Sequence, residues 1–185
     1  MNSFSKANTL IVVALEDELP RELVKDWRVV YTGIGKVNAV IETALAVEED
    51  KPETILNFGT AGASSESLTG LHEVTLLKQR DMDLSPLGFD KGVTPLDDIA
   101  DIDLGREGLS CGTGDNFVNG VQEVVTDLYD MEAYALAKFS LKKQIDFYCF
   151  KFISDQANEE APKEWRESVS SGAEIFINSV LNKTL

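Results

Sequence analysis

Apolar runs and helical patterns alternate along most of the chain. Residues 9–15 (TLIVVAL) form a continuous apolar run, which is typical of a strand buried on both faces of a sheet. Shorter apolar runs predict further strands over residues 28–32, 54–58, 73–78, 108–112 and 147–153. Apolar positions at helical spacing predict helices over residues 37–49, 127–139 and 163–182, and a short helix with Pro20 in its first turn. Strands that alternate with helices predict an α/β fold, which we expect to be a three-layer, mostly parallel mixed sheet flanked by helices.

The length of the chain favours one domain. Its 185 residues suit a single globular unit with a sizeable core, and no linker or internal repeat is visible in the sequence. Residues 81–108 are rich in Asp, Gly and Pro and form the least regular stretch. We therefore expect a single domain over residues 1–185.

Polar side chains follow the predicted strands at their carboxyl ends. In open α/β sheets, ligands bind beyond these ends. Acidic residues 16–18 follow the first strand, and Ser154 and Asp155 end the last. The third strand runs into a small-residue loop, residues 59–63 (GTAGA), whose backbone N–H groups could face a ligand. Acidic residues after a strand commonly cap the next helix. We therefore infer a ligand site only because several strands end in such polar residues.

Glu132 falls on the apolar face of the helix predicted over residues 127–139. The positions that define this face are Leu128, Met131, Ala135, Leu136 and Phe139. A carboxylate on a core face costs several kcal/mol unless it is paired or lines a cavity. The pattern leaves two interpretations open: an ion pair with Lys36 or Lys151, or a carboxylate that accepts ligand hydroxyls at a cavity wall.

The charge of the chain limits its partners. With 32 acidic and 17 basic residues, the formal net charge is −15, which opposes nucleic-acid binding and disfavours anionic substrates. The single histidine, His72, cannot form a His-rich metal site, and Cys111 and Cys149 do not suggest a disulfide framework. The N-terminal apolar run is too short to span a membrane and lacks a signal-peptide cleavage pattern. We therefore expect a cytoplasmic protein with no metal ion, cofactor, nucleic-acid partner or membrane partner.

Six short segments together resemble a known family. In chain order they are residues 14–18 (ALEDE), 32–39 (TGIGKVNA), 57–62 (NFGTAG), 112–118 (GTGDNFV), 130–133 (DMEA) and 153–155 (ISD). The chain resembles the 5′-methylthioadenosine/S-adenosylhomocysteine nucleosidases of the purine nucleoside phosphorylase superfamily, over most of residues 11–158. The resemblance implies a nucleoside phosphorylase-like fold, a homodimer, and a hydrolase that releases adenine from 5′-methylthioadenosine and also from S-adenosylhomocysteine.

The resemblance also implies a role for particular residues. Glu18 would activate the attacking water, and Asp155 would protonate N7 of the purine. Phe117 would stack on the base, and the backbone of Val118 would recognise its Watson–Crick edge. Residues that would contact the rest of the substrate are Leu15 and Ile34 at the 5′ group, Thr60, Ala61 and Gly62 at the ribose and water, Met131 and Glu132 at the ribose hydroxyls, and Lys151 and Ser154 on the strand that leads to Asp155.

The chemistry of N-glycosidic cleavage fits these residue types. The reaction needs an acid at the leaving base and a nucleophile on the opposite face of the sugar, as in inverting glycoside hydrolysis. Asp155 must then carry a raised pKa, and the apolar strand over residues 147–153 provides suitable surroundings. Three consecutive carboxylates at residues 16–18 would repel phosphate, so water is favoured over phosphate as the nucleophile.

Three departures from the family leave alternatives open, of which the mildest is Thr60, where serine is common. Lys151 stands where the family often has arginine, and lysine lacks the planar fork of a guanidinium. The chain is also shorter than most members, with a trimmed stretch between residues 89 and 108. The alternatives are a nucleosidase for another purine nucleoside, a nucleoside phosphorylase, and a purine-binding protein without turnover.

Overall fold

The computed structural model describes residues 4–97 and 99–182. Its strands are β1 (Thr9–Val13), β2 (Arg28–Tyr31), β3 (Thr54–Ala63), β4 (Leu71–Gln79), β5 (Asp101–Asp103), β6 (Leu109–Thr113), β7 (Leu128–Asp130) and β8 (Asp146–Asp155). Its α-helices are α1 (Lys36–Asp50), α2 (Ala133–Lys143), α3 (Ala161–Ser168) and α4 (Ala173–Phe176), and a π-helical segment, Ile177–Leu181, follows α4. The first three residues of the N-terminal segment considered above lie outside the described residues.

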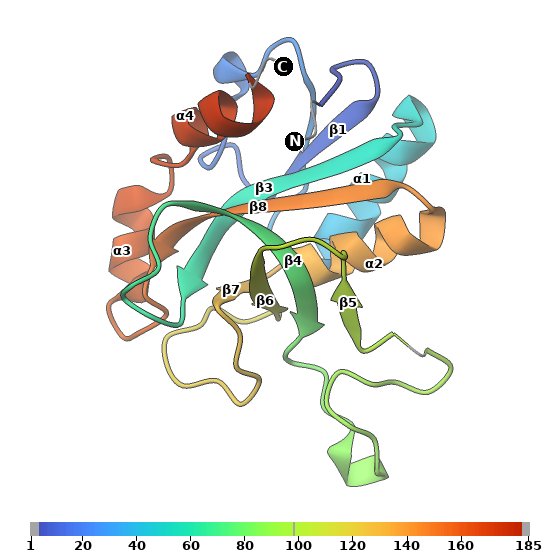
Figure 1. Ribbon diagram of the computed structural model, residues 1–185, viewed down its shortest axis with the longest axis vertical. Coiled ribbons are helices and arrows are strands. Elements are labelled where there is room, and N and C mark those ends of the chain that lie inside the picture. Colours follow the sequence, from blue (N-terminus) through green and yellow to red (C-terminus); the bar gives the residue numbers. More distant parts are fainter. Residues whose placement is uncertain (1–3, 98, 183–185) are drawn as a thin grey trace.

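The strands form one mixed sheet in which β3 has a central place (Figure 1). The first half of β3 pairs in parallel with β1, and its last two residues pair antiparallel with β7. Along its other edge β3 pairs in parallel with β8, which in turn pairs antiparallel with β4. Because β4 also pairs with β6 and β6 with β7, five strands close into a ring, with β2 beyond β1 and β5 beyond β4. Parallel pairings outnumber antiparallel ones, as the sequence predicts.

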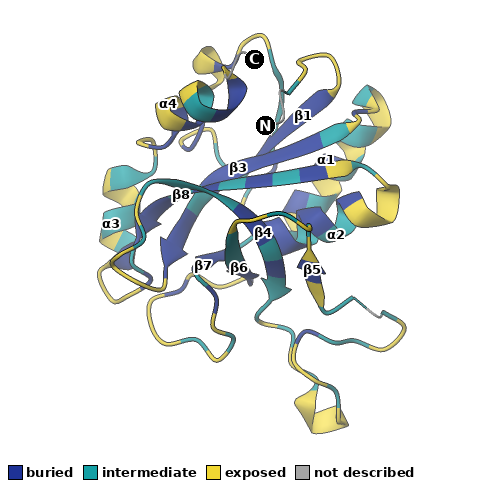
Figure 2. Ribbon diagram, viewed as in Figure 1, coloured by how far each residue is buried: buried dark blue, intermediate teal, exposed yellow. Residues whose placement is uncertain are grey.

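Helices cover both faces of this sheet, which gives three layers (Figure 2). Alternate residues of β1 pack on opposite faces, because successive strand side chains point in opposite directions. Leu10 and Val12 contact the core that includes α1 and α2. Ile11 and Val13 contact the core that includes Phe176 of α4. The continuous apolar run of this strand is therefore explained, and the predicted three-layer α/β fold is confirmed. None of the helices in residues 4–97 and 99–182 is long and apolar enough to cross a membrane.

The predicted loop at residues 59–63 is wrong, because β3 continues to Ala63. Small residues are needed here for close approach rather than for a turn. An added Cβ would lie 3.2 Å from Oε1 of Glu18 at Gly59, and 2.6 Å from Oδ1 of Asp155 at Gly62. The glycines therefore let two carboxylates lie directly against a strand.

Two predicted helices also differ from the structure. The helix predicted over residues 127–139 begins only at Ala133, because Leu128–Asp130 form the buried strand β7, which is too short to show a period of two. The helix predicted over residues 163–182 is broken between α3 and α4. At the break, an added Cβ on Gly172 would lie 2.5 Å from the ring of Phe152, so this close approach to β8 requires glycine.

Candidate active site

A cavity of about 290 Å³ lies beyond the ends of β1, β3, β7 and β8, against α3. Its size is near the lower end of the range for small-molecule sites. Predicted residues that line it are Leu15, Glu18, Ile34, Thr60, Ala61, Gly62, Phe117, Val118, Met131, Glu132, Ser154 and Asp155. Residues that line it without having been predicted are Ala14, Arg80, Asn116, Tyr129, Asp130, Pro162, Trp165 and Arg166.

Glu18 is buried and held by three hydrogen bonds. Its Oε1 accepts from the backbone N–H of Thr60 at 2.7 Å and from the Thr60 hydroxyl at 2.8 Å. Its Oε2 accepts from the backbone N–H of Leu15 at 3.1 Å. Glu18 is the acceptor in all three contacts, which is the role of a carboxylate. The side chain is therefore fixed at the cavity wall by β3 and by the segment that follows β1.

Asp155 lies at the end of β8 in a different environment. Burial raises the pKa of its carboxyl group, although hydrogen bonds from Ala157 and Ser154 act in the opposite direction. The Ala157 N–H donates to Oδ1 at 3.0 Å, and the Ser154 hydroxyl donates to Oδ2 at 2.8 Å. The nearby Glu164 carboxylate raises the pKa of Asp155 further. The direction of the shift agrees with the sequence-based expectation, and it suits a group that gives a proton.

Glu132 precedes α2 instead of lying on a helix face, so the argument from an apolar stripe is wrong for it. Its Oε1 accepts the backbone N–H of Gly35 at 2.8 Å, while Lys36 pairs with Asp81 and Lys151 pairs with Asp130. Burial, strengthened by the Asp130 charge, raises the pKa of Glu132 to about 8. A largely protonated Glu132 at the cavity wall can both donate to and accept from a polyol.

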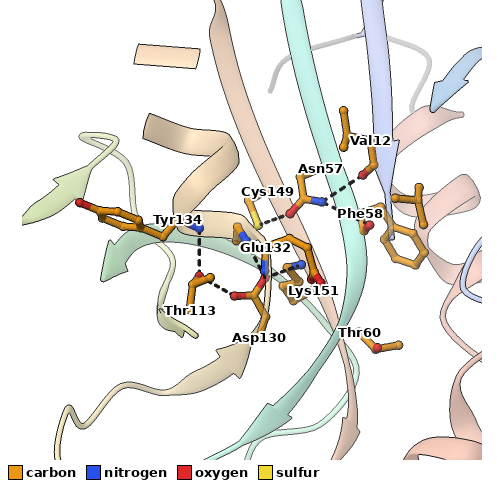
Figure 3. A network of polar contacts seen from close by, with 12 residues as sticks. Val12, Asn57, Phe58, Thr60, Thr113, Asp130, Glu132, Tyr134, Cys149 and Lys151 are labelled. Carbon is orange, nitrogen blue, oxygen red and sulfur yellow. Dashed lines mark hydrogen bonds and ion pairs between the residues drawn. The ribbon is translucent and has the colours of Figure 1, made fainter. Parts of the chain in front are cut away.

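Asp130, which lines the cavity, forms a buried ion pair with Lys151, which does not (Figure 3). The Lys151 ammonium lies 2.9 Å from Oδ2 of Asp130, and both side chains are almost fully buried. Asp130 also accepts the Thr113 hydroxyl at 2.6 Å and the Ala133 N–H at 2.8 Å, so it caps the first turn of α2. Burial alone would raise the pKa of Asp130, but Lys151 and these donors hold it below its ordinary value. Burial alone would lower the pKa of Lys151, but Asp130 raises it.

Lys151 is the predicted site residue that does not line the cavity. Its side chain reaches Asp130 because Gly59 has no Cβ, which would lie 3.3 Å from the ammonium nitrogen. The charge of Lys151 is therefore placed between Asp130 and the strand that faces Glu18. From this position Lys151 supports the wall of the cavity.

Arg80 organises the loop that follows β6. Its guanidinium donates to the carbonyl oxygens of Gly112 and Gly114, and to the side chains of Asn116 and Gln122. An added Cβ on Gly114 would lie 2.8 Å from the guanidinium carbon, so a side chain there would displace the Arg80 guanidinium. This loop presents Phe117, which is half-exposed, and the buried Val118 to the cavity.

Of the lining residues that were not predicted, some lie in a sequence motif and others do not. Asp130 lies in the DMEA segment that supports the resemblance, so its place at the site could have been predicted from the sequence. Arg80 lies just after β4, and Trp165 lies on α3 inside a predicted helix. Neither of these two residues belongs to a pattern that indicates a ligand, so only the fold brings them to the cavity.

Comparison with known proteins adds the family. The chain matches the family model described as the phosphorylase superfamily over residues 22–181. It is 29% identical to a 5′-methylthioadenosine/S-adenosylhomocysteine nucleosidase of Staphylococcus aureus strain Newman, in an alignment that covers 82% of this chain and 78% of the relative. Identity to the protein of the same name from Exiguobacterium is 27%, with 77% of this chain and 72% of the relative covered.

Solved structures show the same fold at low sequence identity. A mutant nucleosidase of Helicobacter pylori, solved with 5′-methylthioadenosine in its active site, has a TM-score of 0.85 and 21% identity, covering 96% of this chain and 99% of that chain. A futalosine hydrolase mutant of the same species has a TM-score of 0.84 and 19% identity, covering 95% of this chain and 99% of that chain. These likenesses extend over nearly the whole of both chains, so the fold is shared throughout.

Proposed function

Because the chain belongs to the phosphorylase superfamily, we propose that it is a purine nucleosidase that hydrolyses the N-glycosidic bond of 5′-methylthioadenosine and releases adenine. S-adenosylhomocysteine is the second substrate in this proposal, as in the names of the curated relatives. The observation that carries the proposal is that Glu18 and Asp155 line the same cavity in contrasting environments. One is held by three donors, and the other has a raised pKa.

Asp155 is the general acid in this mechanism. A purine leaves the sugar readily only when its ring accepts a proton, and N7 is the nitrogen that Asp155 would protonate. A raised pKa keeps the carboxyl group protonated closer to neutral pH, which increases the fraction of enzyme able to give that proton. The Ser154 hydroxyl at Oδ2 then stabilises the carboxylate that remains after the transfer.

Glu18 is the general base. The water attacks the anomeric carbon as the bond to the base breaks and positive charge develops on the sugar. The three hydrogen bonds to Glu18 fix its oxygens, so the orientation of the water is set before the substrate binds. The negative charge of Glu18 also stabilises the developing cation.

The remaining lining residues would orient the nucleoside. Glu132 holds the ribose hydroxyls beside Met131, and Phe117 stacks on the base next to the backbone of Val118. The apolar side chains of Leu15, Ile34 and Met131 accept an uncharged 5′-thioether. Thr60, Ala61 and Gly62 face the ribose and the water from β3.

Water is favoured over phosphate as the nucleophile. Glu18, Glu132 and Asp155 all line the cavity, and the Asp130 carboxylate lies among them. Of the two cations that line it, Arg80 donates to loop carbonyl and amide oxygens. Lys151 offsets the Asp130 charge, and the raised pKa values of Glu132 and Asp155 favour their neutral forms, so the repulsion of a phosphate dianion comes from the Glu18 carboxylate in a partly desolvated space.

A panel of nucleosides tests the proposal. 5′-methylthioadenosine, S-adenosylhomocysteine, adenosine and inosine are incubated with the protein in buffers with and without phosphate, and the free base and the sugar product are measured by chromatography. We expect adenine and the free sugar from the first two substrates at the same rate in both buffers. Formation of a sugar phosphate would identify a phosphorylase, and binding of adenine with no cleavage of any nucleoside would identify a binding protein.

The proposal includes a homodimer. Along α1, Val37, Ile41 and Leu45 follow one another at intervals of four residues and therefore share a face. Each has more than half of its surface exposed, which is unusual for a helix of a monomer. Ile34, also exposed, joins this face to the cavity. A second copy covering the face would therefore help to close the site.

The proposal also places the protein in the cytoplasm and gives it no metal ion or cofactor. Cys111 and Cys149 are free and buried, which suits a reducing compartment. Acid and base chemistry by two carboxylates is sufficient for the reaction as written. One domain over residues 1–185 stays part of this proposal, and the single sheet that joins β1 to β8 supports it.

A further inference from the structure

Trp165 joins α3 to the water-activating side of the cavity. Its indole lines the cavity, and its Nε1–H donates to the hydroxyl oxygen of Thr60 at 3.0 Å. The same hydroxyl lies 2.8 Å from Oε1 of Glu18. An indole nitrogen is a donor only, so the Thr60 hydroxyl must accept from Trp165. Its own hydrogen is then directed to Glu18.

The hydrogen bond from Trp165 fixes the orientation of the Thr60 hydroxyl. A threonine hydroxyl alone can rotate and offer its hydrogen to other acceptors, including a bound water. The Trp165 donor removes that freedom and polarises the hydroxyl toward Glu18, since successive hydrogen bonds strengthen one another. The backbone N–H of Thr60, at 2.7 Å, holds the same oxygen of Glu18 from a second direction.

The position of Trp165 is itself fixed relative to Asp155. Helix α3 packs against β8, beside its carboxyl end in Figure 1. The Ser168 hydroxyl donates to the carbonyl oxygen of Ser154 at 2.7 Å, and Glu164 accepts the backbone N–H of Gln156 at 3.1 Å. These contacts come from residues on both sides of Trp165 and tie α3 to the residues that flank Asp155. Helix α3 therefore fixes the position of Trp165, and through it the Thr60 hydroxyl, relative to Asp155.

We propose that Trp165 is a positioning residue for the nucleosidase reaction, which holds Glu18 through the hydroxyl of Thr60. The inference rests on the proposed function, because it assigns Trp165 to the base of that reaction. The expected effect of replacing Trp165 differs from that of replacing a residue that only lines the cavity. A residue that only shapes the cavity changes KM, whereas a residue that orients the base changes kcat.

A double-mutant cycle separates these roles. Trp165→Phe removes the indole N–H and keeps an aromatic ring, and Thr60→Val removes the hydroxyl and keeps the backbone N–H. We expect each substitution alone to lower kcat about three- to tenfold, which is the effect of one lost hydrogen bond. In the Thr60→Val background, Trp165→Phe should leave kcat unchanged, because its route to Glu18 is already absent. The same loss of kcat in both backgrounds, or a change confined to KM, would overturn the inference.

A second measurement does not depend on turnover. In ¹⁵N-labelled protein, the indole N–H resonance of Trp165 is assigned with Trp27→Phe, which is also the matched control and should leave kcat and KM unchanged. We expect Thr60→Val to shift this resonance and to speed its exchange with solvent, and an unaltered resonance would contradict the hydrogen bond. If the wild-type protein released no base while the resonance shifted, the proposed function would fail and the contact between Trp165 and Thr60 would stand.

Discussion

At the scale of single residues, Glu18 and Asp155 show how neighbouring groups assign different roles to two carboxyl groups. Glu18 receives hydrogen bonds from Leu15 and from both donors of Thr60. Asp155 is buried at the end of an apolar strand, and its pKa is raised for that reason. Two chemically similar groups in one cavity can therefore act as base and acid.

Replacement of Glu18 tests the role of the base. Glu18→Gln keeps the size of the side chain and one acceptor oxygen, but it removes the negative charge. We expect kcat to fall by roughly 10²- to 10⁴-fold with a smaller change in KM, as for loss of a general base. Steady-state kinetics with 5′-methylthioadenosine measure both parameters. A change confined to KM would show that Glu18 binds substrate without activating water.

Glu132 gives a prediction about stability and pH. Burial raises its pKa from 4.5 to about 8 in the folded protein. Between these values the unfolded chain releases the proton and the folded protein keeps it, so the free energy of unfolding falls as pH rises. Glu132→Gln mimics the protonated form and can still accept the Gly35 N–H. The variant should therefore lose at least about 1 kcal/mol less of its free energy of unfolding than the wild type does as pH rises.

Urea unfolding at pH 5 and pH 8 measures this effect. Wild type and Glu132→Gln should have similar stability at pH 5, and the variant should be the more stable at pH 8. A smaller decline is expected to persist in the variant, because the pKa of Asp155 is raised as well. Equal declines in both proteins would show that Glu132 is not held protonated by the fold.

At the scale of elements, most strands and helices were predictable, whereas the three-residue strands β5 and β7 were not. The strands β1 and β8 and the helix α1 carry enough apolar positions to show their period. The three residues of β7 cannot show a period, and the glycines of β3 resemble a loop because their purpose is to make room for Glu18 and Asp155. Both errors fall at the site. There, the packing of side chains against the strands determines the sequence more than the usual hydrophobic pattern of a strand does.

The candidate site was predictable for a related reason. Most of its predicted residues lie in the segments that carry the family resemblance, and the fold brings those segments to one cavity. Lys151 was assigned to substrate but lies behind the wall, paired with Asp130. Trp165 and Arg80 reach the cavity from a helix and a strand end whose sequence carries no ligand pattern. Their roles depend on contacts between distant segments, which a single sequence does not display.

The loop that follows β6 gives a prediction about substrate binding. Arg80→Lys keeps a positive charge but loses the planar donors that hold several loop oxygens. Because the loop carries Phe117 and Val118, we expect KM for the nucleoside to rise roughly tenfold with kcat within about threefold of wild type. The matched control is Arg106→Lys, which alters an ion pair with Glu73 away from the cavity. An equal rise of KM in both variants would contradict the role of Arg80.

At the scale of the whole molecule, the acidic charge becomes easier to interpret. The net charge of −15 coexists with a cavity in which burial raises the pKa of Asp155 and raises that of Glu132 to about 8. An uncharged nucleoside suits this cavity better than a nucleotide does. The exposed apolar face of α1 is the second feature at this scale, since Ile34, just before α1, is exposed and lines the same cavity.

The proposed homodimer is tested by substitution on that face. Sedimentation velocity should give a mass near twice 20.3 kDa for the wild-type protein and a single-chain mass for Ile41→Glu. A charge placed at the centre of an apolar interface is strongly unfavourable. The matched control is Leu23→Glu, at an exposed leucine outside α1, which should stay dimeric. A monomeric wild type, or dissociation of both variants, would contradict the assignment of the face.

The release of adenine from 5′-methylthioadenosine in phosphate-free buffer, compared between wild type and Asp155→Asn, tests the central claim most directly. Asparagine keeps the shape of the side chain but cannot give the proton to the base, so the variant should turn over at least about 10²-fold more slowly. Its unfolding midpoint should stay close to that of wild type, and it should still bind the nucleoside. Wild-type turnover by Asp155→Asn, or no release of adenine by the wild-type protein, would contradict the account.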